Sequence, residues 1–270
     1  MPADPGDRFA AESEFHMMKN INLLLVEHCN LACAHCSTGS PFAAKAFHPT
    51  ASFFKWLDLL EHLQLPFTFI SLTGGEPFLH PEVRDGSCIQ SLRDRYPFKR
   101  VGATTNFFWG NEELIKAYAR IIDRMNGGLA ISIYEPIVRK LGGPDAFNRL
   151  TQSLKDACPN TWITLDDRKE FLEWEFHEDQ REVKGPCSTS DCFVLHPSGR
   201  LSHCSVAVGA QNIPRFNSIL ERSSEAFFDL NNLERVGAEE FLSWSAKYPF
   251  DLCSNCTMWR GKHQPWSSLR

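Results

Sequence analysis

Short apolar runs alternate with amphipathic stretches between residues 21 and 165 of this chain. Each expected strand is brief, and each intervening stretch has apolar residues near helical spacing. This alternation predicts repeated strand–helix units and therefore a parallel sheet in an α/β fold. The expected strands are 21–26, 67–72, 100–108, 129–134 and 161–165, and the expected helices are 51–65, 81–96, 111–125 and 144–158.

Two motifs follow the first two expected strands. The cysteines Cys29, Cys33 and Cys36 come after the first, and the turn Gly74-Gly75-Glu76-Pro77 closes the second. Parallel α/β folds bind their ligands at the carboxyl ends of the strands. We therefore expect the two motifs to lie at the same edge of the sheet, where they would form one site.

Composition divides the chain into three parts. Residues 1–18 are a lead-in segment rich in prolines and acids, and residues 19–170 hold the strand–helix units. The alternation weakens after Asp166, and residues 171–270 carry five of the ten cysteines. We expect a main α/β domain over 19–170, followed by a small Cys-rich extension that contains a β-hairpin and helices.

Cysteine content and charge limit the classes of function. Ten cysteines in 270 residues are too sparse for a small disulfide scaffold. The acidic first 20 residues have no basic n-region and no apolar h-region, so we expect a cytoplasmic protein with reduced thiols. A net charge of −5 argues against a nucleic-acid partner. The longest apolar run near the N-terminus, 23–26, is far below the roughly 18 residues of a membrane span.

The first cysteine cluster has the spacing C-x3-C-x2-C over Cys29, Cys33 and Cys36. Three thiolates in one compact loop are suited to three irons of an iron–sulfur cubane, which leaves the fourth iron open to a ligand. A zinc site with His28 or His35 as fourth ligand is the first alternative. Three unrelated buried thiols are the second.

The cysteine spacing, together with Gly74-Gly75-Glu76-Pro77 after the next strand, resembles the radical S-adenosylmethionine (SAM) superfamily. The resemblance implies a partial (β/α)6 TIM-like barrel with a SAM-binding 4Fe–4S cluster on the three cysteines. In that family, one electron splits SAM into methionine and a 5′-deoxyadenosyl radical, which takes a hydrogen from the substrate. An electron donor such as flavodoxin or ferredoxin and a small-molecule substrate are the implied partners.

The same resemblance assigns residues that bind SAM. The turn residues Gly74, Gly75 and Glu76 are expected at the methionine amino group, although a plain turn would have the same composition. Polar residues near later strand ends are expected at the ribose or the methionine carboxylate, and a ring before the last cysteine is expected near the adenine. By position in this sequence, these are Asn106, Ser132 and His35.

A second set of cysteines lies in the extension. Cys187 and Cys204 bracket an expected hairpin whose tip is Pro197-Ser198-Gly199, and Cys253 and Cys256 form a C-x2-C pair. Four thiolates suit either structural zinc or an iron–sulfur cluster. The arrangement is similar to the Twitch form of the SPASM extension, which implies that these four cysteines hold one auxiliary 4Fe–4S cluster.

Three cysteines are left over. Cys192 is an alternative first ligand in place of Cys187, a hydrogen donor to a substrate radical, or a buried thiol. Cys88 and Cys158 stand outside both clusters and are expected to be buried.

Four functions are open at this point. The arrangement resembles Twitch-type oxidoreductases of the superfamily, so we expect the two-electron oxidation of a small polyol or sugar-like molecule. Arg168, after the fifth strand, is a candidate for contact with the substrate, or alternatively for a surface ion pair with Asp166 or Asp167. The alternatives are a sugar epimerase that uses Cys192, a maturase of a ribosomal peptide, and a zinc-stabilised binding module.

Overall fold

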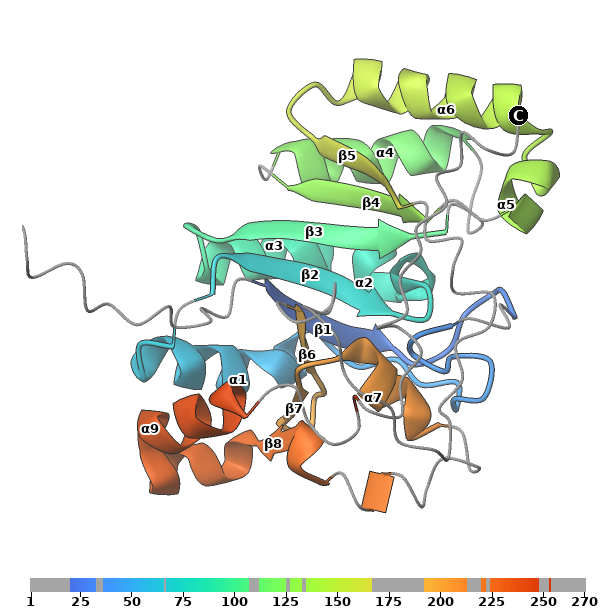
Figure 1. Ribbon diagram of the computed structural model, residues 1–270. Coiled ribbons are helices and arrows are strands. Elements are labelled where there is room, and N and C mark those ends of the chain that lie inside the picture. Colours follow the sequence, from blue (N-terminus) through green and yellow to red (C-terminus); the bar gives the residue numbers. More distant parts are fainter. Residues whose placement is uncertain are drawn as a thin grey trace, which may run out of the picture.

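A computed structural model describes residues 20–32, 36–65, 67–106, 112–124, 127–132, 135–166, 192–212, 220–221, 224–247 and 253. The described strands form one eight-stranded sheet in the order β5-β4-β3-β2-β1-β6-β7-β8. Its ends are β5 and β8, so the sheet is open. Figure 1 shows the strands β1 to β5 running in the same direction, with their arrowheads on the right.

The first five strands are the ones that the sequence predicts, and all their pairings are parallel. They are β1 (Asn20–Val26), β2 (Phe69–Gly74), β3 (Arg100–Thr105), β4 (Gly128–Ser132) and β5 (Trp162–Asp166). The interior of β1 is almost wholly buried, with Leu23 and Leu25 fully covered. Strands covered on both faces are typical of parallel sheets, so the prediction of an α/β fold is confirmed.

Helices between the strands supply the rest of the core. The main ones are α1 (Ala51–His62), α3 (Ser87–Arg95), α4 (Glu112–Arg124) and α6 (Pro144–Ala157). Helix α1 buries Phe53, Leu57 and Leu60, and α4 buries Ile115, Ala119 and Ile122, in each case at a spacing of three or four residues. Apolar residues at this spacing form one stripe along a helix, which packs against the sheet.

Shorter elements lie between these, and the sequence pattern did not predict them separately. They are the 3₁₀ turn η2 (Pro77–Leu79) and the helices α2 (Pro81–Arg84) and α5 (Glu135–Lys140). The expected helix over 81–96 is divided into α2 and α3 at Gly86, whose φ of 82° lies in the left-handed region. Among the described residues, no helix combines the length and the apolar character needed to cross a membrane.

The extension continues the same sheet on the other side of β1. Strand β6 (Cys192–Leu195) pairs with β1 in parallel, and β7 (Arg200–Ser202) pairs with β6 antiparallel. The expected hairpin is therefore confirmed. The remaining elements are α7 (Ser205–Ala210), η5 (Ser224–Ala226), β8 (Phe227–Asp229), η6 (Leu230–Asn232) and α9 (Leu233–Ala246). Figure 1 shows them gathered beside β1, at the end of the sheet away from β5.

Helix α1 also packs against the tip of this hairpin. The indole Nε1 of Trp56 donates a hydrogen bond to the Pro197 carbonyl at 2.9 Å. A Cβ on Gly199 would lie 2.6 Å from the Trp56 ring, and the φ of Gly199 is +89°. The tip therefore needs glycine both for its backbone conformation and for contact with the helix. The predicted domain boundary near 170 lies in 167–191, outside the described residues.

Candidate active site

The carboxyl ends of β1, β2 and β3 bring the predicted motifs together. Because these strands are parallel neighbours, the residues that follow them meet at one edge of the sheet. Cys29 follows β1, the Gly-Gly-Glu turn ends β2, and Asn106 follows β3. Hydrogen bonds join all three segments.

The two glycines of the turn pack directly on the backbone of the cysteine loop. The Gly75 N–H donates to the Val26 carbonyl at 2.7 Å, and the Glu76 N–H donates to the His28 carbonyl at 3.2 Å. A Cβ would lie 1.9 Å from the Val26 oxygen at Gly74 and 1.8 Å from the His28 oxygen at Gly75. Both positions exclude any side chain, because the loop before Cys29 already occupies that space.

Glu76 is buried and accepts three hydrogen bonds from the protein. Its Oε1 accepts from the Phe78 N–H at 3.1 Å and from the Thr105 hydroxyl at 3.0 Å, and its Oε2 accepts from the Asn106 N–H at 2.8 Å. Burial is the largest influence on this carboxyl and raises its pKa to about 7, although these donors oppose the shift. Since an ionised carboxylate has about four acceptor sites, one further donor can still be bound.

Asn106 connects β3 to the first cysteine of the loop. Its Nδ2 donates to the Cys29 Sγ at 3.4 Å and to the Asn30 side-chain oxygen at 2.9 Å. The Leu31 N–H also donates to the Cys29 Sγ, at 3.4 Å. Donors aimed at sulfur stabilise a thiolate, which is the form that ligates iron.

Cys36, at the other end of the loop, is linked to the glycine turn through Thr38. The Thr38 hydroxyl lies 3.3 Å from the Cys36 Sγ and donates to the Gly74 carbonyl at 3.1 Å. Thr38 and Thr105 are site residues that the sequence reasoning missed. Their positions in the sequence could have indicated a role in the site. Thr38 follows the last cysteine of the motif by two residues, and Thr105 directly precedes Asn106.

The cysteine loop also packs against the extension. The Asn212 side chain donates to the Thr38 carbonyl at 3.1 Å. A Cβ on Gly209, near the end of α7, would lie 2.2 Å from the Ser37 carbonyl oxygen. Helix α7 begins directly after Cys204, whose Sγ accepts from the Val206 N–H at 3.3 Å. One short helix thus leads from Cys204 to the loop that carries Cys36.

The remaining predicted residues have varied positions. Ser132 is buried at the end of β4, on the same edge of the sheet as Asn106. Cys253 lies within the described part of the chain and is half-buried. The predicted residues that lie outside the described part of the chain are Cys33, His35, Arg168, Cys187 and Cys256.

Cys192 lies at the opposite edge from the cysteine loop. It begins β6 and pairs with Asn20, the first residue of β1. The loop starts after Val26, six residues further along β1, which is about 20 Å at about 3.3 Å per residue. This placement argues against Cys192 as a hydrogen donor at the loop. Cys88 and Cys158 are both buried, as expected.

The residues present fit an iron–sulfur group. Cys29 and Cys36 each have a hydrogen-bonding neighbour at the sulfur, Asn106 for Cys29 and Thr38 for Cys36. The backbone of the glycine turn fixes the loop that carries them. A loop rich in thiols and held by backbone contacts is what ligation by cysteine requires.

A solved structure shares this fold. This structure of BtrN, described as a complex with AdoMet and 2-DOIA, is 16% identical, covers 88% of this chain and 92% of its own, and has a TM-score of 0.53. An open form of BtrN is 14% identical at the same coverage, with a TM-score of 0.49. The enzyme anSMEcpe with bound AdoMet and a peptide is 14% identical over 54% of this chain and 42% of its own, with a TM-score of 0.38. No curated protein sequence matches the chain.

A protein-family model identifies the family of this chain. The model described as the radical SAM superfamily matches residues 23–165, more than half of the chain. That span begins in β1 and ends in β5, and it contains the cysteine loop, the glycine turn and Asn106. The family implies a 4Fe–4S cluster and SAM as cofactors. This chain belongs to the radical SAM superfamily.

Proposed function

We propose that this chain is a radical SAM oxidoreductase that oxidises a small polyol or sugar-like molecule by two electrons. The observation that carries the proposal is the joining of the extension to the site, through the packing of α7 on the Cys36 loop. The fold likeness to BtrN, whose structure contains AdoMet and 2-DOIA, spans 88% of this chain and so includes most of the extension. The spacing of the cysteines in the extension is also similar to that of 2-deoxy-scyllo-inosamine dehydrogenase.

Cys29, Cys33 and Cys36 would hold the first cluster, with SAM at its open iron. The bound group supplies a 5′-deoxyadenosyl radical that removes a hydrogen atom from a carbon next to a hydroxyl. This chain's own residues position that group. Asn106 donates to Cys29, and Thr38 connects Cys36 to the Gly74 carbonyl. Three donors use three of about four acceptor sites of Glu76. The remaining site would accept from the methionine ammonium, with Ser132 and His35 at the carboxylate and the adenine.

Cys187, Cys204, Cys253 and Cys256 would hold an auxiliary 4Fe–4S cluster in the extension. After hydrogen abstraction, the substrate radical must lose one proton and one electron to become a ketone. The auxiliary cluster would accept the electron, and Arg168 would contact the substrate. Helix α7 supports this arrangement because it runs from Cys204 to the residues that pack on the Cys36 loop.

An epimerase is the second candidate, because it needs only a thiol near the substrate. The position of Cys192 at the amino end of β6 favours the oxidoreductase instead.

Anaerobic reconstitution followed by metal analysis tests the proposal first. Two cubanes require about eight irons per chain, whereas four irons with one zinc would refute the electron-accepting role. A second arm uses 2-DOIA and related polyols labelled with deuterium at carbons that bear hydroxyl groups. Transfer of deuterium to 5′-deoxyadenosine, with one SAM consumed per ketone formed, supports the proposal. Deuterium from solvent in an unoxidised product would identify an epimerase.

A further inference from the structure

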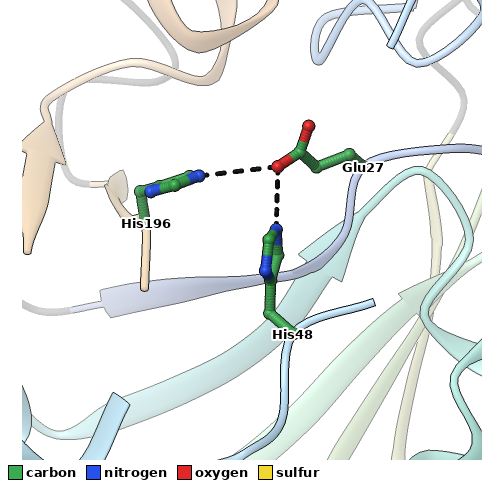
Figure 2. Close-up of side chains that lie close together, drawn as sticks. All are labelled: Glu27, His48 and His196. Atoms are coloured by element: carbon green, nitrogen blue, oxygen red, sulfur yellow. Dashed lines mark hydrogen bonds and ion pairs between the residues drawn. The ribbon is translucent and has the colours of Figure 1, made fainter. Parts of the chain in front are cut away.

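Three side chains far apart in the sequence converge beside the cysteine loop. The Glu27 Oε1 lies 2.8 Å from the His48 Nε2 and 3.5 Å from the His196 Nε2. Figure 2 shows both imidazoles directed at this one carboxylate oxygen, with the second oxygen turned away from them. The ligand atoms of all three residues lie within 4.8 Å of one another.

The topology of the sheet explains how these residues meet. Glu27 directly follows β1, and His196 directly follows β6, which is the parallel neighbour of β1. His48 lies on a segment that returns alongside the end of β1, where Phe47 forms an antiparallel bridge with Val26. All three residues therefore lie at the carboxyl edge of the sheet, where parallel α/β folds place their ligands.

The backbone at each position is held by its own hydrogen bond. The Glu27 N–H donates to the Ala46 carbonyl at 3.2 Å, and the His48 N–H donates to the Leu25 carbonyl at 2.9 Å. The His196 N–H donates to the Arg200 carbonyl at 2.9 Å, across the hairpin. These backbone contacts do not depend on the side chains, so the three side chains are pre-arranged rather than held only by each other.

The geometry and the donors suit one metal ion. Zinc binds imidazole nitrogen and carboxylate oxygen at about 2.0–2.2 Å, so two ligands of a tetrahedral site are about 3.3 Å apart. The separations of 2.8 and 3.5 Å lie on either side of this value. Two histidines and one glutamate are also a known zinc ligand set that leaves one coordination position open.

We propose that Glu27, His48 and His196 bind one divalent metal ion in a site separate from the iron–sulfur ligands. The two imidazoles and one carboxylate identify the ion as zinc. The side chains of Glu27 and His48 are each 20% exposed, and that of His196 is 36% exposed. Water can therefore occupy the open coordination position. The ion joins the end of β1 to the hairpin of the extension, next to the loop that carries Cys29.

Ser198 holds the His196 ring in place from its other side. The Ser198 hydroxyl lies 2.7 Å from the His196 Nδ1, and the Ser198 N–H donates to the same nitrogen at 3.1 Å. Both contacts are made at Nδ1, so Nε2 is the ring nitrogen that faces Glu27. Contacts of this kind fix the orientation of a ligating ring.

Metal analysis of the full-length chain with its reconstituted clusters tests the site. The protein is equilibrated with Zn²⁺, freed of loose metal by gel filtration, and analysed for zinc and iron together. We expect His196→Ala and Glu27→Gln each to lose about one zinc per chain relative to the wild type, with iron unchanged. The matched control is His62→Ala, since His62 is exposed on α1 and remote from the three residues in sequence. It should keep the zinc.

Equal zinc content in wild type, His196→Ala and Glu27→Gln would overturn the proposal. Diffraction at the zinc edge from Zn²⁺-soaked wild-type crystals gives an answer that needs no variant. An anomalous peak within about 2.2 Å of all three ligand atoms supports the site. A peak only at cysteines, or no peak, would overturn it. None of these outcomes depends on SAM cleavage, so the site and the proposed function can fail independently.

Discussion

The side-chain amide of Asn106 donates a hydrogen bond to the Sγ of Cys29 at 3.4 Å. The end of β3 therefore acts on the first cysteine of the loop that follows β1. Donors to the sulfur ligands of a cluster stabilise its reduced, more negative state and so raise its reduction potential. This contact links a residue that the sequence assigned to SAM binding with the electronic properties of the proposed cluster.

Replacement of Asn106 is expected to lower the potential of this cluster. Asn106→Ala removes the donor, and Asn106→Asp places a negative charge near the sulfur, so the aspartate variant should have the lower potential of the two. An anaerobic redox titration followed by electron paramagnetic resonance measures the midpoint. An unchanged midpoint in both variants would show that the hydrogen bond has no role in tuning the cluster.

A single methyl group at Gly75 should displace the cysteine loop. A Cβ there would lie 1.8 Å from the His28 carbonyl oxygen, so Gly75→Ala requires the backbone to move. We expect a loss of stability near the upper end for single substitutions, about 4 kcal/mol or more, and loss of cluster iron. Thermal unfolding and iron analysis measure the two effects.

Gly128→Ala is the matched control for this substitution. A Cβ at Gly128 would meet its first neighbour, the Trp162 ring, at 3.4 Å, which is ordinary van der Waals contact. This variant should keep its iron and most of its stability. If Gly75→Ala were as stable and as rich in iron as Gly128→Ala, the close packing of the turn on the loop would be disproved.

The affinity for SAM should depend on pH through Glu76. Burial raises the pKa of this carboxyl to about 7, so it is mainly protonated below that pH. Binding of an ammonium group favours the ionised carboxylate. Affinity should therefore rise with pH up to about 7, by at most about tenfold per pH unit, and then level off.

Glu76→Gln provides the control because glutamine does not titrate. Calorimetric titration of the chain with SAM at several pH values measures the dependence, and the part due to Glu76 is the difference between the two proteins. Parallel pH profiles for wild type and Glu76→Gln would exclude the carboxylate from ammonium binding.

The contact between α1 and the hairpin tip should contribute measurably to stability. Trp56→Phe removes the hydrogen bond to the Pro197 carbonyl but keeps an aromatic ring. We expect a loss of about 1 kcal/mol, which lowers the melting temperature by about 2 °C in a chain of this size. Trp162→Phe is the control, because Trp162 is 58% exposed. This substitution should change the free energy of unfolding by less than about 0.5 kcal/mol. Equal shifts in the two variants would contradict the assigned role of the hydrogen bond.

The sequence predicted the strands and the meeting of the two motifs because both depend on local signals. Apolar runs such as Leu23–Val26 specify buried parallel strands, and the residues after such strands gather at one edge of the sheet. The resemblance placed Gly75 at the methionine amino group. In the structure, the need for glycine at this position arises from the backbone of the cysteine loop, which no single-sequence pattern reveals.

Other features depend on contacts between distant segments. His196 meets Glu27 only because β6 pairs with β1 across the predicted domain boundary, and nothing in either local sequence indicates that pairing. Thr105 and Thr38 were missed for a similar reason. A threonine near a strand end or a cysteine is common, and its importance depends on the partner that the fold supplies, Glu76 in one case and the Gly74 carbonyl in the other.

The central claim is that this chain uses the cysteine loop for radical SAM chemistry, and formation of 5′-deoxyadenosine tests it most directly. The measurement uses anaerobically reconstituted protein, a strong reductant and SAM, with Cys29→Ala as the test variant. Cys88→Ala is the control, because Cys88 is buried outside both proposed clusters. We predict 5′-deoxyadenosine from the wild type and from Cys88→Ala, and none from Cys29→Ala. No product from the fully reconstituted wild type, or equal product from Cys29→Ala, would contradict the account.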